Sequence, residues 1–323
     1  MVAISLFTLG GTIAMRDEGG GARPALGPAE LMAGLDLDPA HVDLTAEAVV
    51  NLPSGHLTLD DIYDLARRIR AAIDDGAEAV VVTQGTDTLE ETAFALDLLL
   101  DVDQPIVITG AMRAASTLGT DGPTNLHAAI LTAADPTARG RGVLVVLNDS
   151  VHGARGVTKA HTSRVDAFRT RDGGPIGLIA EGRIVWAGAL TRSPRLVLPL
   201  QARARVPVYT SYLGDDGVAL LALAAMDLQG LVVEGFGGGH VPPALGQTLE
   251  SVAAQVPVVL ASRCAEGPVL TQSYGYAGSE RDLIARGLIP AGNLAGVKAR
   301  LALTILLDGG ADLERVKAFF AAL

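Results

Sequence analysis

Short runs of apolar residues, many of them β-branched, recur along the chain and end abruptly at polar segments that contain glycine. In the first half of the chain such runs occupy residues 2–7, 80–82, 105–109 and 142–147. Continuous apolar runs of this kind are typical of strands that are buried on both faces. Between the runs, apolar residues recur at helical spacing, and Thr58 stands where it can cap one such helix. Alternating strands and helices predict a mainly parallel sheet.

The pattern changes in the middle of the chain. Residues 175–180 and 183–188 flank the pair Glu181-Gly182, which predicts an antiparallel hairpin. The stretch that follows, up to residue 207, is rich in proline and arginine and is the best candidate for a linker.

A second set of elements fills the last third of the chain. Strands are predicted over residues 228–234 and 256–262, and helices over 243–254, 294–306 and 313–322. The sequence thus predicts an α/β protein with two domains. A larger N-terminal α/β domain over residues 1–190 has a mostly parallel sheet with an antiparallel hairpin, a linker spans 191–212, and a smaller C-terminal α/β domain covers 213–323.

Length and composition agree with this division and narrow the class of protein. At 323 residues the chain is long enough for two domains. Although 49% of the residues are hydrophobic, no run approaches the ~18 apolar residues that a membrane span needs. The chain enters its first strand without a basic segment, so we expect no secretory signal and no membrane partner.

The charged and cysteine residues suggest what the protein does not bind. The formal net charge is −11 and the basic residues are scattered, so no nucleic-acid partner is expected. The single cysteine, Cys264, excludes an intramolecular disulfide and a multi-cysteine metal site. The six histidines are scattered too; we expect His152 and His161 to make hydrogen bonds, and we expect no metal site. An acidic chain with one cysteine fits a cytoplasmic protein.

Two turns that follow predicted strands contain side chains that can take part in catalysis. Gly85 is followed by Thr86 and Asp87 at the carboxyl end of a buried strand, where open α/β sheets place ligands. Thr88 and Glu91 have the spacing of a capping box at the start of the next helix. A simple strand–turn–helix corner is the alternative, and it would be favoured if this were the only corner.

The other corner places Thr12 after two glycines at the end of the first strand, so its hydroxyl could face the same pocket. Lys159 is one of only three lysines among 25 basic residues. A buried lysine can act as a base, whereas an arginine cannot, although a solvated lysine on a loop would need no function. Together the three positions suggest a hydroxyl nucleophile, an acid–base relay and a carboxylate for a cationic substrate group.

With these residues in order, the sequence resembles the bacterial-type L-asparaginases and glutaminase-asparaginases. The resemblance rests first on residues 10–14, 85–88 and 158–159. It is reinforced by residues 109–113, 121–126 and 297–300, which occur in the family's order over nearly the whole length. Residues 235–240, by contrast, begin like a dinucleotide-binding loop but have histidine where the third glycine belongs.

The resemblance implies roles for matching residues. Thr12 corresponds to the nucleophile that forms an acyl-enzyme, and Thr86 with Lys159 and Asp87 to the second catalytic group. Asp87 also corresponds to the residue that meets the substrate's α-amino group. The remaining substrate-binding positions that the resemblance implies are Ser54 for the α-carboxylate, Gly55 beside it, and Ala111, whose backbone carbonyl accepts from the amide.

The sequence also departs from the family. Family members have a tyrosine in the loop that here spans residues 16–27, where we expect a lid or a disordered connection, and Ala22 takes its place. Clear counterparts of a family asparagine near residues 238–239 and of a family glutamate near 271–275 are missing. We expect Tyr274 or Tyr276 to supply the missing phenol, because the family contributes this segment across a subunit interface.

Two readings of function follow. In the first, the protein is a cofactor-independent amidohydrolase that converts L-asparagine, or else L-glutamine, through a threonine acyl-enzyme, and it forms a homodimer or homotetramer. In the alternative, it is a catalytically weak or inactive relative that binds an amino acid. A tRNA-dependent amidotransferase subunit is disfavoured because the sequence starts directly at its first strand.

Overall fold

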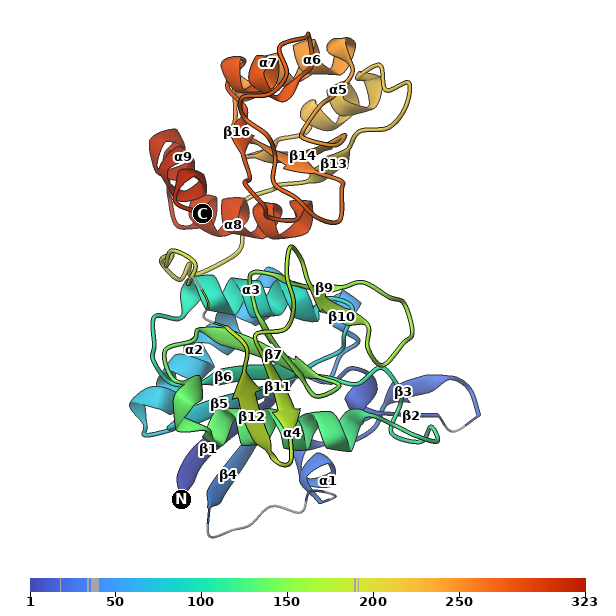
Figure 1. Cartoon of the computed structure of the whole chain (residues 1–323), viewed down its shortest axis with the longest axis vertical. Helices are drawn as coiled ribbons and strands as arrows, with labels where there is room; N and C mark the ends of the chain where they lie inside the picture. The colour runs from blue at the N-terminus through green and yellow to red at the C-terminus, as the bar shows by residue number, and fades with distance from the viewer. Residues whose placement is uncertain (18, 34, 36–40, 189, 191) are drawn as a thin grey trace. The chain divides into compact units, whose positions relative to one another are not determined.

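The computed structural model describes residues 1–323 apart from 18, 34, 36–40, 189 and 191 (Figure 1). The chain divides into two units, Met1–Ser193 and Pro194–Leu323. Each unit has its own sheet and its own hydrophobic core. Strand β13, Val208–Thr210, belongs to the sheet of the second unit, so the prediction of a linker over 191–212 is wrong for these three residues.

The first unit is built on an eight-stranded sheet of order β12-β11-β8-β7-β6-β5-β1-β4 (Figure 1). Five of its strands are parallel: β4 (Val42–Ala48), β1 (Val2–Thr8), β5 (Ala79–Thr83), β6 (Ile106–Thr109) and β7 (Val143–Leu147). The other three, which continue the sheet in antiparallel pairing, are β8 (Ser150–Gly153), β11 (Gly177–Ala180) and β12 (Arg183–Trp186).

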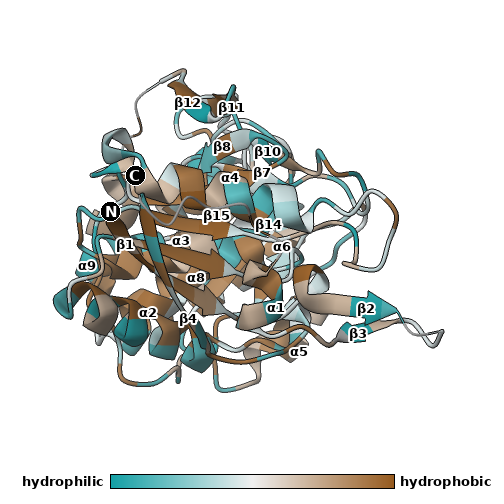
Figure 2. Ribbon diagram, turned by 90° about the horizontal axis from the view of Figure 1, so that it is seen from below, coloured by the Kyte–Doolittle hydropathy of each residue, from teal (hydrophilic) through white to brown (hydrophobic). Residues whose placement is uncertain are grey.

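Helices on both faces of this sheet explain why its central strands are apolar throughout. All residues of β5, β6 and β7 are buried. Figure 2 shows β1, which pairs with β5 in the same sheet, largely in the hydrophobic colour. Helix α4 (Gly122–Ala134) packs on one face, whereas α2 (Leu59–Asp74) and α3 (Leu89–Leu99) cover the other (Figure 1). A parallel sheet covered on both faces needs such continuous apolar strands.

The predicted hairpin after residue 170 is confirmed. Strands β11 and β12 pair with Gly177 opposite Trp186, and the turn residues Glu181 and Gly182 have φ values of 51° and 71°. Two successive left-handed residues give the hairpin turn whose twist matches the strands.

The glycine-rich segment after the first strand is more ordered than expected. Strands β2 (Met15–Asp17) and β3 (Ala22–Pro24) form an antiparallel hairpin, not a plain loop. The Asp17 carboxylate accepts hydrogen bonds from the backbone N–H groups of Gly19 and Gly21 and so holds the turn. Helix α1 (Pro28–Met32) follows the hairpin.

One helix start is as predicted and another is not. The Thr58 hydroxyl accepts from the Asp61 N–H and caps α2 in a capping box. At α3 the helix begins after Thr88, but the predicted capping box with Glu91 is wrong. The Thr88 hydroxyl instead donates to the Ser54 carbonyl at 3.0 Å and accepts from the Gln84 amide at 3.1 Å, so it serves the neighbouring segment.

The second unit has a four-stranded parallel sheet of order β13-β14-β15-β16. Beside β13 its strands are β14 (Leu231–Gly235), β15 (Val258–Ser262) and β16 (Ile289–Pro290). Its helices are α5 (Val218–Ala224), α6 (Pro243–Ala253), α7 (Glu280–Ala285), α8 (Gly296–Asp308) and α9 (Leu313–Ala321). The sequence predicted β14, β15, α6, α8 and α9 close to these bounds but not the shorter elements.

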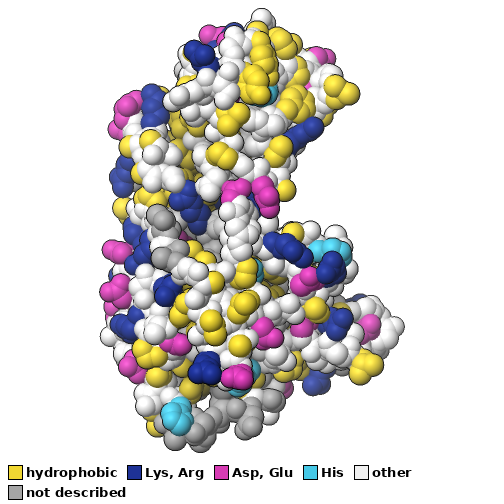
Figure 3. Space-filling model, in the orientation of Figure 1, with side chains coloured by type: hydrophobic (Ala, Val, Ile, Leu, Met, Phe, Trp, Pro, Cys, Tyr) yellow, Lys and Arg dark blue, Asp and Glu magenta, His cyan; other side chains and the backbone are white. Residues whose placement is uncertain are grey.

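Exposed apolar side chains gather on the second unit, where Figure 3 shows several hydrophobic residues at the surface. Those around α5 are Tyr212, Leu213, Val218, Leu221 and Met226. No helix among the described residues is long and apolar enough to cross a bilayer.

Candidate active site

The first two predicted corners leave the sheet side by side. Strands β1 and β5 are parallel neighbours in which Thr8 pairs with Thr83, and the Leu9 N–H donates to the Thr83 carbonyl at 2.9 Å. After these strands, both segments of the chain turn at the carboxyl edge of the sheet. Gly11 has a φ of 82°, and a Cβ at this position would overlap the backbone of Gly85. The corner that carries Thr12 therefore touches the corner that carries Thr86.

The third corner follows β6 and supports the second. A Cβ on Gly110 would lie 3.2 Å from the Thr86 methyl group, so these two backbones approach closely. Ala111 follows and is fully buried. Ala111 therefore lies at the same edge of the sheet as Thr86.

Two polar residues that the sequence analysis did not single out hold this corner. The Asp121 carboxylate accepts from the N–H groups of Met112 and Arg113, both at 2.9 Å. The Asn125 amide donates to the Gly110 carbonyl at 2.9 Å and to Asp121 at 3.0 Å. Residues 121–126 thus position the backbone around Ala111.

Ser54 enters the site from a fourth segment, the 3₁₀ turn Ser54–His56. Its side chain is buried, and its hydroxyl accepts from the Asp87 N–H at 3.2 Å. A Cβ on Gly85 would lie 2.7 Å from this hydroxyl, so Gly85 leaves room for it. Because the oxygen of Ser54 accepts from the backbone, its proton is free to be donated elsewhere. Gly55, beside it, is exposed.

Lys159 completes the cluster from β9 (Val157–Lys159), which pairs with β10 (Phe168–Thr170). Its ammonium donates to the Thr86 hydroxyl at 2.9 Å and to the Asp87 carboxylate at 2.6 Å. The Lys159 side chain is 14% exposed and that of Asp87 is 76% exposed, so the carboxylate faces solvent while the lysine does not. The expected contact between residues 86 and 159 is confirmed.

The two histidines near Lys159 make hydrogen bonds, as expected. His152 is buried on β8, with Nδ1 2.8 Å from the Thr170 hydroxyl. Burial lowers the pKa of His152 to about 4, so the ring is neutral at pH 7. His161 Nδ1 accepts from the N–H groups of Ser163 and Arg164. Within the described ranges, no cluster of three histidine, cysteine or acidic side chains could hold a metal ion.

Tyr274 and Tyr276 lie in the second unit, in the loop before α7, and about half of each side chain is exposed. The Tyr276 phenol lies 2.9 Å from Nδ1 of His240. No sequence signal pointed to His240, because 36 residues separate it from Tyr276.

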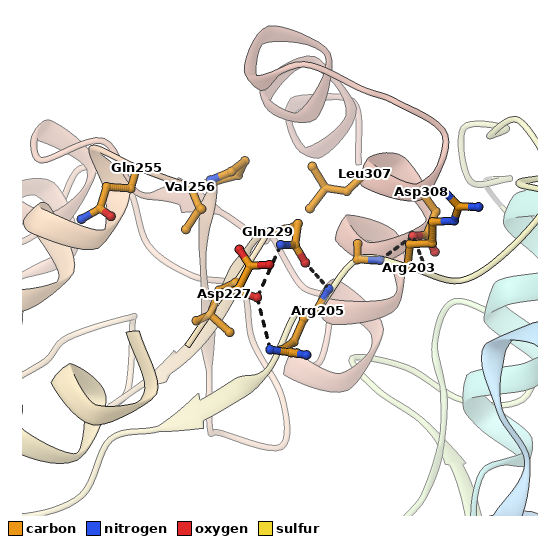
Figure 4. A pocket seen from close by; sticks show the side chains of 11 residues that line it. Arg203, Arg205, Asp227, Gln229, Gln255, Val256, Leu307 and Asp308 are labelled. Carbon is orange, nitrogen blue, oxygen red and sulfur yellow. Dashed lines mark hydrogen bonds between the residues drawn. The ribbon is translucent and has the colours of Figure 1, made fainter. Parts of the chain in front are cut away.

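A cavity of about 630 Å³ also lies in the second unit, at the amino ends of its strands (Figure 4). Its polar lining groups bond to one another: Arg205 N–H donates to the Gln229 side chain, and Arg203 N–H donates to Asp308. Open α/β sheets bind ligands at the opposite, carboxyl ends of their strands. The candidate active site is therefore the cluster of the first unit.

That cluster has the parts that covalent acyl transfer requires. A threonine hydroxyl needs a partner that handles its proton. Lys159 and Thr86 form a hydrogen-bonded pair, and the corner that carries Thr86 touches the corner that carries Thr12. The exposed carboxylate of Asp87 can receive a cationic substrate group.

Comparisons with known proteins show what the chain is similar to. Residues 3–192 match the family model described as Asparaginase, N-terminal, and residues 205–320 match Glutaminase/Asparaginase C-terminal domain. A probable L-asparaginase of Deinococcus radiodurans is 41% identical over 98% of this chain and 96% of its own length. An L-asparaginase of Bacillus licheniformis is 37% identical over 94% of this chain and 95% of its own.

A solved structure is similar over the whole length. The crystal structure of a probable cytoplasmic L-asparaginase from Campylobacter jejuni superimposes with a TM-score of 0.89 and 30% sequence identity. The match covers 99% of this chain and 99% of that one.

Proposed function

Because the chain belongs to the asparaginase family, we propose that it is an amidohydrolase that converts L-asparagine to L-aspartate and ammonia, with Thr12 as its nucleophile. The observation that carries the proposal is the contact of the Lys159 ammonium with both the Thr86 hydroxyl and the Asp87 carboxylate. A site that only bound an amino acid would need the carboxylate but not this lysine–threonine pair.

The first half-reaction forms an ester. The Thr12 oxygen attacks the side-chain amide carbon and gives up its proton, the C–N bond breaks, and the nitrogen leaves as ammonia after taking up a proton. We propose that backbone N–H groups at the glycine corners beside Thr12 and Thr86 stabilise the oxyanion, at roughly 3 kcal/mol for each donor. In the second half-reaction water attacks the ester, L-aspartate leaves, and the Thr12 hydroxyl is restored.

Lys159 and Thr86 serve the water step and the proton transfers. As an ammonium, Lys159 donates to the Thr86 oxygen and stabilises negative charge that develops there. The Thr86 hydrogen is then directed away from the lysine and toward the substrate. Asp87 balances the ammonium through its 2.6 Å contact, so the buried lysine is not an unpaired charge.

The substrate's polar groups have matching partners. We propose that Asp87, whose carboxylate is largely exposed, receives the α-ammonium group. The Ser54 hydroxyl, with its oxygen already occupied by the Asp87 N–H, donates to the α-carboxylate beside Gly55. The Ala111 carbonyl accepts from the substrate amide, on a segment held by Asp121.

The base that activates Thr12 comes from elsewhere, because no tyrosine precedes Tyr63. We propose that Tyr274 or Tyr276 of a second copy supplies this phenol in a homodimer or homotetramer. Replacing both tyrosines by phenylalanine in one chain would then lower kcat by about 10²-fold or more. Wild-type rates for Tyr274→Phe and Tyr276→Phe would contradict this.

Substrate choice and location extend the same proposal. L-Asparagine is the proposed substrate and L-glutamine the competitor, and one methylene group is worth only ~1–3 kcal/mol of discrimination. We also propose that the protein acts in the cytoplasm and needs no cofactor.

A coupled ammonia assay tests the function. Purified protein is given L-asparagine and, separately, L-glutamine, and ammonia and the amino acid product are both measured. Turnover that disappears in Thr12→Ala, while calorimetry still detects L-asparagine binding, supports the proposal. Wild-type protein that binds L-asparagine without releasing ammonia would make it an amino-acid-binding relative.

A further inference from the structure

A second constellation of ionisable side chains lies in the second unit, outside the cluster around Lys159. It joins a carboxylate, an imidazole and a phenol by hydrogen bonds. Glu280 Oε2 lies 3.1 Å from His240 Nε2, and His240 Nδ1 lies 2.9 Å from the Tyr276 phenol. The order from the interior outward is Glu280, fully buried, then His240, partly buried, and last Tyr276, half exposed.

The hydrogen bonds around Glu280 favour its ionised form. Its other oxygen, Oε1, accepts from the N–H groups of Ser273 and Tyr274 at 2.8 and 2.7 Å. Burial alone would raise the pKa of Glu280, but the hydrogen bonds from the Tyr274 and Ser273 N–H groups hold that pKa below its usual value. The nearest ion pair on α7, Asp282 with Arg286, is separate from this carboxylate.

An ionised Glu280 fixes the tautomer of His240. A carboxylate can only accept, so Nε2 must carry the hydrogen, and a neutral ring then leaves Nδ1 as an acceptor. Nδ1 faces the Tyr276 phenol, so the phenol donates to the imidazole. The rings of Tyr274 and Tyr276 pack edge-on against His240, with centroids 4.9 and 5.6 Å away, and hold its plane.

The glycine-rich loop after β14 positions His240 beside Glu280 and Tyr276. The chain turns back so that Phe236 and His240 form a β-bridge, and Arg263 stacks on Phe236 from the end of β15. The side chain of Leu270 occupies the space that a Cβ on Gly238 would need. The loop thus serves an imidazole, not a nucleotide, and it stands at the carboxyl edge of the parallel sheet, where such folds place functional groups.

We propose that Tyr276, His240 and Glu280 form a proton relay that makes the Tyr276 phenol the general base for the Thr12 hydroxyl of a second copy of the chain. This rests on the proposed function. As the Thr12 oxygen bonds to the amide carbon, its proton passes to the Tyr276 oxygen while the phenolic proton passes to His240 Nδ1. Glu280 stabilises the imidazolium. When the C–N bond breaks, His240 returns its proton to the phenol oxygen, and the phenol protonates the leaving nitrogen, so no proton is lost or gained.

The assignment selects Tyr276 over Tyr274. Tyr274 contributes its backbone N–H to Glu280 and its ring to the packing of His240, but only the Tyr276 phenol is seen on Nδ1. His240 and Glu280 are positioning and relay residues, because they act on substrate only through Tyr276.

Kinetics test the relay. We expect Tyr276→Phe, His240→Gln and Glu280→Gln each to lower kcat by about 10²- to 10³-fold with KM changed by less than about twofold. The double variant Tyr276→Phe/His240→Gln should be no slower than either single variant, because removing one member already disables the unit. Tyr212→Phe, which removes another half-exposed phenol of the same unit, is the matched control and should keep wild-type kcat. A normal kcat in His240→Gln, or losses that multiply in the double variant, would overturn the relay.

A spectroscopic measurement needs no turnover. In ¹⁵N NMR of the wild-type protein, with His240 assigned through the His240→Gln spectrum, we expect a neutral ring protonated at Nε2. Protonation at Nδ1 instead would overturn the relay. The two proposals fail differently: an active wild type with a normal His240→Gln removes only the relay, whereas a wild type that releases no ammonia removes the proposed function itself.

Discussion

At the scale of single residues, the proposed catalysis depends on the position of the Lys159 ammonium group. Lys159 is mostly shielded from solvent, yet it is in contact with both a hydroxyl and a carboxylate. Lys317, by contrast, lies on the surface of α9 and pairs with Glu314 one turn away. The two lysines therefore differ: one is a shielded ammonium held by two polar side chains, and the other is an ordinary surface charge.

We predict that Lys159→Met lowers kcat for L-asparagine by about 10²- to 10⁴-fold, because Thr86 loses its charged partner. The matched variant Lys317→Met should keep wild-type kcat. Steady-state ammonia release at saturating substrate measures both. Equal activity in the two variants would remove Lys159 from the mechanism.

His152 gives a prediction for stability against pH. Burial lowers its pKa to about 4 in the folded chain, whereas the unfolded value is about 6.5. The unfolded state therefore binds the proton more tightly, and stability is lost as pH falls through the range from about 6.5 to about 4. Between pH 7.5 and 4.5 this residue alone accounts for roughly 2 kcal/mol.

Urea unfolding followed by the fluorescence of Trp186, the only tryptophan of the chain, reports on the first unit. We expect the loss of stability between the two pH values to be smaller in His152→Gln than in the wild type by about that amount. An identical loss in both proteins would mean that His152 is protonated in the folded state.

At the scale of elements, the close contact of two strand–turn corners creates the site. The φ of Gly11 lies in the left-handed region, and the backbone of Gly85 occupies the space that a Cβ on Gly11 would need. Only glycine therefore fits at this position. Gly20, in the nearby hairpin, has nothing within 4 Å of such a Cβ. The contact is a property of the two β–turn segments together.

We predict that Gly11→Ala lowers the free energy of unfolding of the first unit by about 2–4 kcal/mol, because the corners must separate. Gly20→Ala should change it by less than about 0.5 kcal/mol. Urea titrations monitored at Trp186 compare the two. A Gly11→Ala variant as stable as Gly20→Ala would mean that the corners are not in contact.

Elements with a strong periodic signal could be predicted from the sequence, and elements that depend on distant partners could not. The apolar runs of β5 and β6 and the cap at Thr58 are local and were found. The role of Thr88 was missed because Ser54, 34 residues away, competes for its hydroxyl. The hairpin β2–β3 has little apolar pattern of its own, so its sequence predicts a loop.

The same reasoning applies to the site. Thr12, Thr86 and Asp87 follow strand ends, which a sequence shows. The contact between His240 and Glu280, on which the proposed relay depends, joins residues 40 positions apart in the sequence. His240 lies in the glycine-rich loop after β14, and Glu280 begins α7, a helix too short to predict from the sequence. The sequence therefore does not show that these two residues meet.

At the scale of the whole molecule, the two units divide the proposed chemistry. The nucleophile and the lysine belong to Met1–Ser193, and the phenol to Pro194–Leu323. If each site combines the first unit of one copy with the second unit of another, defects in different units can complement each other.

We predict that co-expressed Thr12→Ala and Tyr276→Phe chains recover about a quarter of wild-type activity, because half of the dimers are hybrids with one intact site of two. Thr12→Ala mixed with Lys159→Met should recover none, since both defects lie in the same unit. Activity per site, titrated in purified mixtures, measures this. No recovery in the first mixture would mean that sites are not shared between copies.

The measurement that tests the central claim most directly is partition of the reaction by hydroxylamine. If Thr12 carries an acyl group, the wild type should form β-aspartyl hydroxamate in proportion to added hydroxylamine while L-aspartate falls, and Thr12→Ala should form neither. Consumption of L-asparagine by the wild type without any hydroxamate, or hydroxamate made by Thr12→Ala, would contradict the account.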